Sequence, residues 1–151
     1  MSFKTILLLG LALAPAFACS GKGFRFTEVT TRGYQLSDAW ARTSRPPHAN
    51  SAAFLELKNL GDESISIVNA STPRAGVTEL HTMIMENDTM KMRRVDTIDI
   101  PTGETAVLKP GSDHLMFFEL DGAWEVGQKI PISVELNDGT KIDFEVEVRE
   151  L

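Results

Sequence analysis

Two histidines and three methionines in the middle of the chain have the types and the spacing of a metal site. Residues 81–83 and 114–116 both read His-x-Met, and Met92 lies between them. Ten residues separate His81 from Met92, and twenty-one separate Met92 from His114. Imidazole nitrogen and thioether sulfur together suit monovalent copper better than other common biological metals. The pattern predicts a Cu(I) site in a protein that carries copper rather than uses it for chemistry.

The cysteine content restricts the kind of metal site that the chain can form. A blue-copper electron-transfer centre needs a cysteine thiolate. Cys19 is the only cysteine, and it precedes every segment with a strand pattern. A structural zinc site would prefer several cysteines or more histidines at short spacings. Both of these sites are therefore excluded, and so is an internal disulfide.

The elements around these residues are predicted to be β-strands. Short runs of alternating apolar and polar residues fill the chain from residue 36 onward. Turn residues separate these runs roughly every 8 to 12 residues, which is typical of a β-sandwich or barrel. No segment keeps a helical period.

Strand geometry would bring the candidate ligands to one patch. Side chains two positions apart on a strand share a face, so the His and Met of each triplet point the same way. A two-residue hairpin turn at Asn87-Asp88 would place Met83 opposite Met92. Three strand segments would then deliver two imidazoles and one or more thioethers. Met83 and Met90 are candidate supplementary ligands, and Met85 is expected in an apolar collar.

Two other interpretations fit the same residues. One is a metal-dependent hydrolase or oxidase that uses His48, His81 and His114, with an open coordination position and a general base. The other is a structural β-sandwich whose methionines only fill the core, since methionine is common there. Trp40 and Trp124 are expected to pack in the core or at its rim.

The spacing and the surrounding sequence resemble the PCu(A)C-type periplasmic copper chaperones. Their motif is a His, ten residues, a Met, twenty-one residues and His-x-Met. The chain has this motif without a change in either spacing, at His81, Met92, His114 and Met116. Similar context surrounds it at residues 38–42, 79–83, 90–93 and 108–111. The resemblance extends over about residues 36–148.

The resemblance implies a fold, a cargo and a route for the copper. The fold is all-β, a cupredoxin-like or immunoglobulin-like Greek-key β-sandwich over residues 36–151. Cu(I) is held near the surface by the four motif residues. Delivery goes to the assembly of cytochrome c oxidase, often alongside a Sco-type thiol protein. Many relatives also carry a His- and Met-rich C-terminal tail, and this sequence ends without one.

The N-terminal residues predict export. Lys4, the apolar stretch 6–17 and the small-x-small run 16–18 form a signal peptide with a cleavage site. Cleavage after residue 18 would leave Cys19 first, followed by a flexible lead-in over 19–35. We expect a periplasmic protein, either acylated at Cys19 as a lipoprotein or released. The formal charge of −6 and the absence of a basic stripe argue against nucleic acid as a partner.

Overall fold

The computed structural model describes residues 28–31, 33–44 and 50–151, and this part of the chain is built from strands alone. The all-β prediction is confirmed. Within the described ranges, no helix is long and apolar enough to cross a membrane. The eleven strands are β1 Val29–Thr31, β2 Tyr34–Arg42, β3 Asn50–Asn59, β4 Ile65–Ser71, β5 Ala75–Glu86, β6 Thr89–Val95, β7 Ile98–Ile100, β8 Thr105–Leu108, β9 His114–Leu120, β10 Lys129–Leu136 and β11 Lys141–Arg149.

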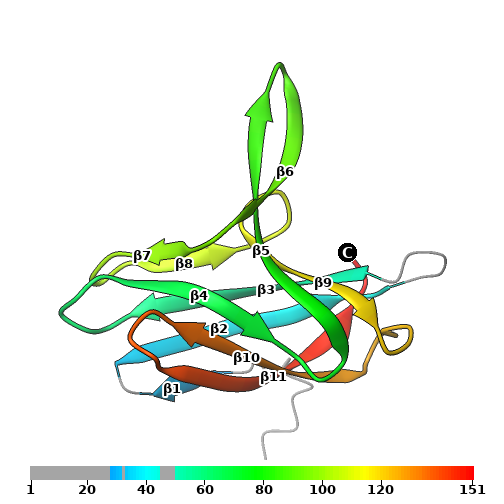
Figure 1. Ribbon diagram of the computed structural model, residues 1–151. Coiled ribbons are helices and arrows are strands. Elements are labelled where there is room, and N and C mark those ends of the chain that lie inside the picture. The colour runs from blue at the N-terminus through cyan, green and yellow to red at the C-terminus, as the bar shows by residue number, and fades with distance from the viewer. Residues whose placement is uncertain (1–27, 32, 45–49) are drawn as a thin grey trace, which may run out of the picture.

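The strands form one continuous mixed sheet that folds back on itself around a single core. The order is β6-β5-β9-β3-β2-β11-β10-β4-β7, with β1 paired to β2 and β8 paired to β3. Only β11 and β2 are parallel neighbours. Distant parts of this path come together again, because β4 contacts β5 and β7 contacts β8. Figure 1 shows the resulting layers, from which the β5–β6 hairpin rises away.

An irregularity in β2 explains why the layers are joined into one sheet. The register with β3 shifts between Ser37 and Trp40, where Asp38 has a φ of 50°. A bulge of this kind bends a strand and increases its twist. The first part of β2 pairs with β1 and the last part with β11, so β2 passes from one layer to the other.

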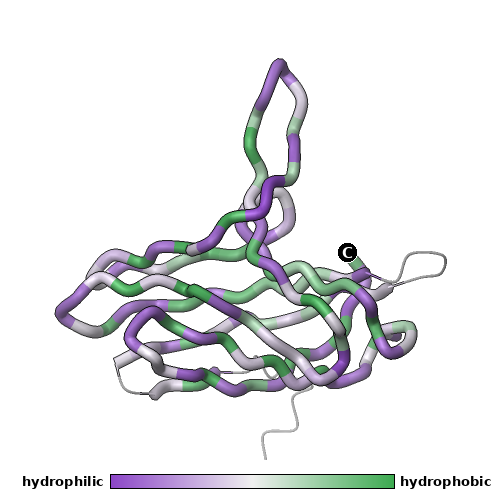
Figure 2. The backbone as a smooth tube through the Cα atoms, viewed as in Figure 1, coloured by the Kyte–Doolittle hydropathy of each residue, from purple (hydrophilic) through white to green (hydrophobic). Residues whose placement is uncertain are grey.

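The core follows the period of two that the sequence shows. Along β10 and β11, buried and exposed residues alternate almost without exception. Figure 2 shows the same alternation of hydrophobic and hydrophilic residues. The inward side chains of these two strands are Ile130, Ile132, Val134, Leu136, Ile142, Phe144, Val146 and Val148.

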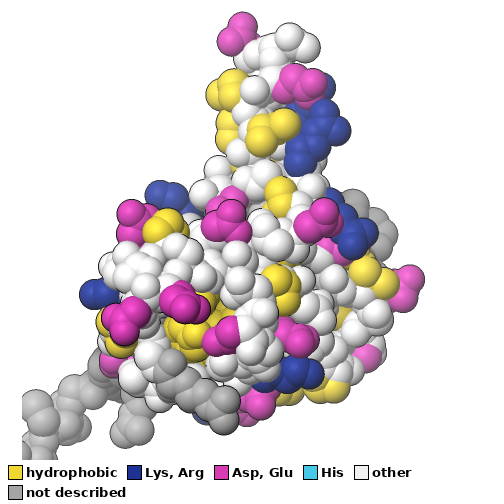
Figure 3. Space-filling view, turned by 60° about the vertical axis from the view of Figure 1, so that its left-hand side comes forward, with side chains coloured by type: hydrophobic (Ala, Val, Ile, Leu, Met, Phe, Trp, Pro, Cys, Tyr) yellow, Lys and Arg dark blue, Asp and Glu magenta, His cyan; other side chains and the backbone are white. Residues whose placement is uncertain are grey.

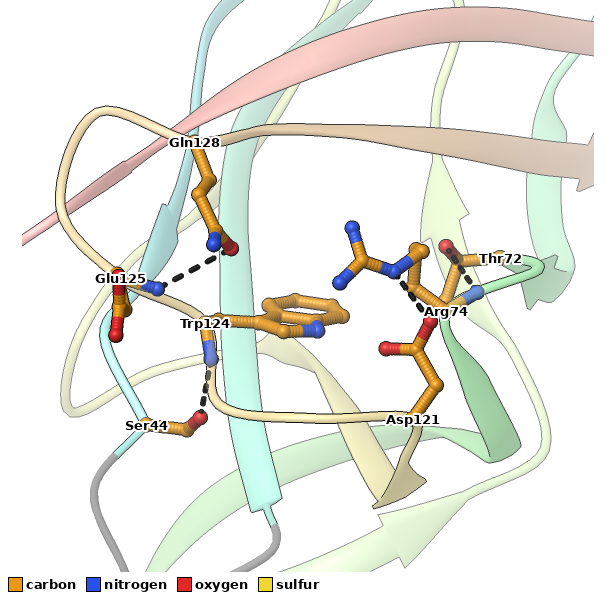
Figure 4. Close-up of polar contacts among 7 residues, drawn as sticks. All are labelled: Ser44, Thr72, Arg74, Asp121, Trp124, Glu125 and Gln128. Atoms are coloured by element: carbon orange, nitrogen blue, oxygen red, sulfur yellow. Dashed lines mark hydrogen bonds and ion pairs between the residues drawn. The ribbon is translucent and has the colours of Figure 1, made fainter.

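The loop between β9 and β10 is fastened to the core by Trp124. The side chain of Trp124 is fully buried, as predicted, and its ring lies 5.2 Å from that of Phe117, measured between centroids. Its backbone N–H donates to the Ser44 hydroxyl at 2.8 Å. On the other side of the ring, Arg74 pairs with Asp121 at 2.6 Å (Figure 4). Trp40, also expected at the core, is half-buried against Phe54.

Element boundaries differ from the sequence prediction in two places. β1 pairs with β2 inside the expected lead-in, so ordered structure begins before residue 36. The alternating residues 90–98 predict a single strand, but a bend at Asp96 divides them between β6 and β7. The signal peptide, Cys19 and His48 lie outside the described residues.

Replacing Tyr34 with Phe should lower the free energy of unfolding by about 1 kcal/mol near pH 7, the usual value of one hydrogen bond. The Tyr34 hydroxyl donates to the Asp138 carboxylate at 2.5 Å, across 104 residues of chain. That bond lowers the pKa of Asp138 and raises the pKa of Tyr34. Urea unfolding of both proteins measures the difference.

The pH dependence of this loss has a definite sign. Because the pKa of Asp138 is lower in the folded protein than in the unfolded chain, the bond adds its full stability at pH values above the ordinary aspartate pKa. This stability is lost as the pH falls through the lowered pKa of the folded protein. The raised pKa of Tyr34 acts at high pH: the stability is complete below the ordinary tyrosine pKa and is lost as the pH rises through the raised pKa. The cost of Tyr34→Phe should therefore shrink as the pH falls below the ordinary pKa range of aspartate. A cost that is unchanged there would contradict the assignment.

Candidate metal centre

The candidate ligands lie on three neighbouring strands in the register expected from the sequence. On β5 and β9, His81 and His114 are direct cross-strand partners. On β5 and β6, Met83 is the partner of Met92. The hairpin between β5 and β6 turns at Asn87 and Asp88, both with positive φ (51° and 59°), which suits a two-residue turn. The predicted pairing of Met83 with Met92 is confirmed.

All of these side chains except that of His81 line a cavity of about 220 Å³ at the base of the hairpin. One part of its wall is formed by Met83, Met92, His114 and Met116. The ring of His81 lies beside it, 5.8 Å from that of His114 between centroids. The remainder of the wall consists of Arg42, Asn50, Ser51, Ala52, Phe54, Pro110, Gly111 and Leu151. Three of the four residues predicted as ligands therefore line the cavity, and the fourth, His81, neighbours one of them without lining it.

The imidazoles and the thioethers differ in exposure. His81 and His114 are 8% and 4% exposed, whereas Met92 is 45% exposed. None of the five described methionines belongs to the buried core. The interpretation in which these methionines only fill the core is therefore wrong, because packing would have drawn their side chains inward. An ion here would be held by buried nitrogens and reached from solvent past the sulfurs.

Burial and one backbone contact fix the state of His114. Its Nδ1 lies 2.8 Å from the Ser112 carbonyl oxygen, which can only accept, so Nδ1–H donates. The pKa of His114 is lowered by burial first and also by its neighbour His81, against the raising effects of Ser112 and Asp113. A neutral imidazole with its proton on Nδ1 keeps the lone pair of Nε2 available for a metal.

His81 is oriented by a carboxylate that the sequence analysis did not assign. Its Nε2 lies 2.8 Å from Oε2 of Glu79, and Oε1 of Glu79 accepts from Arg94 at 3.3 Å. The imidazole N–H donates to the carboxylate, which leaves the lone pair on Nδ1. That nitrogen is buried and has no hydrogen-bond partner among the described residues. A buried polar atom without a partner requires an explanation, and a bound cation would provide one.

Sequence comparison places the chain in a known family. The profile of a family described as "Putative lipoprotein LpqE-like" matches residues 34–148. The chain belongs to the LpqE-like family. It is 31% identical over 119 residues to "Putative lipoprotein Lxx21020" of Leifsonia xyli subsp. xyli (strain CTCB07), covering 78% of this chain and 70% of that protein. It is 30% identical to the uncharacterized protein RP573 of Rickettsia prowazekii (strain Madrid E), covering 72% of this chain and 62% of that one.

Solved structures show that this LpqE-like chain has the fold of PCuAC domains, as the sequence resemblance implies. The copper-bound PCuAC domain from PmoF2 superposes with a TM-score of 0.71 at 13% identity, over 83% of this chain and 99% of that domain. The Cu(I) form of DR1885 from Deinococcus radiodurans superposes with a TM-score of 0.56 at 28% identity, over 75% and 77%. At least two proteins with this fold therefore bind copper.

The two candidate supplementary ligands of this LpqE-like chain, Met83 and Met90, differ in their position relative to the cavity. Met83, a candidate supplementary ligand, lies in the cavity wall. Met90, the other candidate, is instead the cross-strand partner of Met85, nearer the hairpin turn, and neither of them lines the cavity. Over residues 28–31, 33–44 and 50–151, no three His, Cys, Asp or Glu side chains gather as a metal-binding group.

Replacing Glu79 with Gln should weaken Cu(I) binding by roughly 10- to 100-fold, the usual effect of losing a partner that orients a metal-bound histidine. Glutamine can donate to Nε2 as well as accept, so it no longer fixes the proton there. Position 79 could have been suspected from sequence, because it shares a strand face with position 81. Anaerobic titration against a Cu(I) chelator gives the affinity.

The control for this measurement removes the same charge elsewhere. Glu104 is exposed in the loop before β8, so Glu104→Gln should bind Cu(I) like the wild type. If both variants bind like the wild type, the carboxylate of Glu79 does not support the site.

Proposed function

We propose that this chain is a copper carrier that binds one Cu(I) through His81, Met92, His114 and Met116. The observation that carries this proposal is that Met92, His114 and Met116 line one cavity, while the neighbouring ring of His81 has a buried nitrogen without a partner among the described residues. Two imidazoles and two thioethers are neutral, soft-to-borderline donors that suit Cu(I) better than Zn(II) or Mg(II). The Cu(I) form of a relative with 28% identity supports the same cargo.

The role is transfer rather than catalysis. The thioethers that would hold the ion are partly exposed, so the sulfur or nitrogen of an acceptor can reach the metal before the first ligands leave. The imidazoles stand on core strands and need little reorganisation. Such a site supports stepwise ligand exchange with Cu(I) keeping its charge throughout. The rival hydrolase interpretation depends on His48, which lies outside the described residues.

The proposal extends to the protein that receives the copper and to the cellular compartment of the chain. The spacing of the four residues supports delivery to the CuA site of cytochrome c oxidase during assembly, with a Sco-type thiol protein or an oxidase subunit as the acceptor. The family description as a lipoprotein supports an exported chain in the periplasm. Cys19 would then be its acylated anchor, and several acyl chains would give stable attachment to the membrane.

An anaerobic Cu(I) titration against a competing chelator tests this function. The wild-type chain should bind one equivalent tightly, and Met92→Leu should bind more weakly, because leucine keeps the volume but lacks the sulfur. Leu151→Met, which adds a thioether at the cavity wall, is a control that should not lose affinity. Binding of no tight equivalent by the wild type would refute the proposal.

A further inference from the structure

The β5–β6 hairpin carries two more methionines than the cavity uses. Met85 and Met90 are cross-strand partners next to the turn, one step along the hairpin from the pair Met83 and Met92. Side chains of directly opposed residues lie on the same side of a two-stranded ribbon, with Cβ atoms about 5 Å apart. Two pairs of thioethers therefore occupy one face, about 7 Å from each other along the strands.

The other face of the hairpin has a different chemistry. Glu86 pairs with Lys91 at 2.8 Å and with Arg93 at 2.9 Å. These residues alternate in sequence with the methionines, so they occupy the opposite face. Figure 3 shows exposed hydrophobic side chains on the hairpin beside a group of Lys and Arg. The four sulfurs therefore lie on one face of the hairpin, and the ion pairs of Glu86 with Lys91 and Arg93 lie on the other.

Exposure increases toward the turn along β5 but not along β6. On β5, His81 is buried, Met83 is half-buried and Met85 is 66% exposed, whereas Met92 and Met90 on β6 are both 45% exposed. Apolar side chains of this size, exposed together on a projecting element, need a reason. Beyond its strand partner β5, β6 makes no extensive contact with another described element. An acceptor can therefore approach the end of the hairpin from either side.

We propose that Met85 and Met90 form a second, weaker Cu(I) site, through which copper passes between the cavity and an acceptor. The inference rests on the proposed carrier function. Two thioethers without an imidazole bind Cu(I) less firmly than the four-ligand set, which suits a transfer site. During transfer, Cu–S and Cu–N bonds in the cavity break as Cu–S bonds to Met85 and Met90 form. Copper stays Cu(I), and the imidazoles and thioethers are neutral both bound and free, so no electron or proton is exchanged.

Binding at this second site can be followed at each sulfur. The full chain is labelled with ¹³C at the methionine methyl groups and titrated anaerobically with Cu(I). The first equivalent should shift the methyl signals of Met92 and Met116, and the second those of Met85 and Met90. A second equivalent that leaves the Met85 and Met90 signals in place would overturn the second site. Unshifted signals of Met92 and Met116 after the first equivalent would instead refute the carrier function, so the two failures differ.

The rate of copper transfer tests the role of the pair. Bathocuproine disulfonate, a chelator too large to enter a cavity of about 220 Å³, serves as the acceptor. Met85→Leu/Met90→Leu should slow Cu(I) release to it several-fold while the affinity for the first equivalent stays unchanged. Ile84→Leu, on the charged face of the same strand, is the matched control and should transfer like the wild type. Equal rates in all three proteins would exclude a relay through the end of the hairpin.

Discussion

Replacing His114 with alanine is expected to lower the affinity for Cu(I) by roughly 100-fold or more, since losing even a supporting partner of a metal ligand costs roughly 10- to 100-fold. His114 is 4% exposed and lines the cavity, with its Nε2 lone pair left free by the bond from Nδ1–H to Ser112. No other imidazole in the described chain can take its place, because His81, the only other described histidine, is already a ligand in the proposed site. The measurement is anaerobic competition against a Cu(I) chelator.

A second variant separates lost coordination from lost packing. His114→Phe keeps an aromatic ring at this position, 6.3 Å from the Phe54 ring between centroids, but removes both nitrogens. It should fold with near-normal stability and still lose Cu(I) affinity. If the alanine and phenylalanine variants both bind one equivalent as tightly as the wild type, His114 is not a ligand and the proposed function loses its main support.

Replacing Trp124 with alanine should lower the free energy of unfolding by about 3–5 kcal/mol, the usual range for removing a large buried aromatic side chain. Trp124 is fully buried and packs on Phe117. The loss has two sources: the free energy gained by burying the indole is lost, and the cavity that the indole leaves costs further free energy. The loop between β9 and β10 also loses its anchor in the core (Figure 4). Chemical denaturation followed by circular dichroism measures the change.

An exposed residue in the same loop gives the matched control. Val126 is 62% exposed, so Val126→Ala should change stability by less than about 0.5 kcal/mol. Trp124 does not line the cavity, so Trp124→Ala should still bind Cu(I) under conditions where it is folded. A loss of Cu(I) affinity in the folded variant would show that Trp124 acts on the site, and a destabilisation below about 1 kcal/mol would contradict the packing argument.

The division of ligands between body and hairpin has a physical consequence for a carrier. Both histidines stand on strands that pair within the body, where packing restricts their rotamers. Met92 comes from β6, which is held almost entirely by β5. In the proposed site, the nitrogens on β5 and β9 would form a preformed half, and the exposed thioether of Met92 on β6 would be the first to leave. This arrangement lets affinity and release coexist in one site.

Much of the site followed from local rules. The period of two placed each His and Met of a triplet on one face, and the two-residue turn at Asn87 and Asp88 set the register that pairs Met83 with Met92. The expected all-β class also followed, because no helical period competed with the strand pattern. These features depend on residues that are close in sequence, so the chain specifies them directly.

Other features depend on residues that are distant in sequence. The contact of Glu79 with Arg94 on the neighbouring strand required the folded structure, whereas the position of Glu79 on the strand face of His81 did not. The separation of Met90 from the cavity required the bounds of the cavity itself. The fusion of the layers into one sheet depended on the shift in β2 at Asp38. None of these has a local pattern that distinguishes it from ordinary strand sequence.

By itself, the sequence determined which donors the protein has, how far apart they lie along the chain, and which strand faces they share. It could do so because side-chain chemistry and strand alternation are properties of short segments. Only the tertiary structure decided that β9 lies beside the β5–β6 hairpin, that His81 faces His114, and that one imidazole nitrogen is left buried without a partner among the described residues. The physical reason is that the pairing of distant strands is settled by the burial of one shared core, to which all the strands contribute at once.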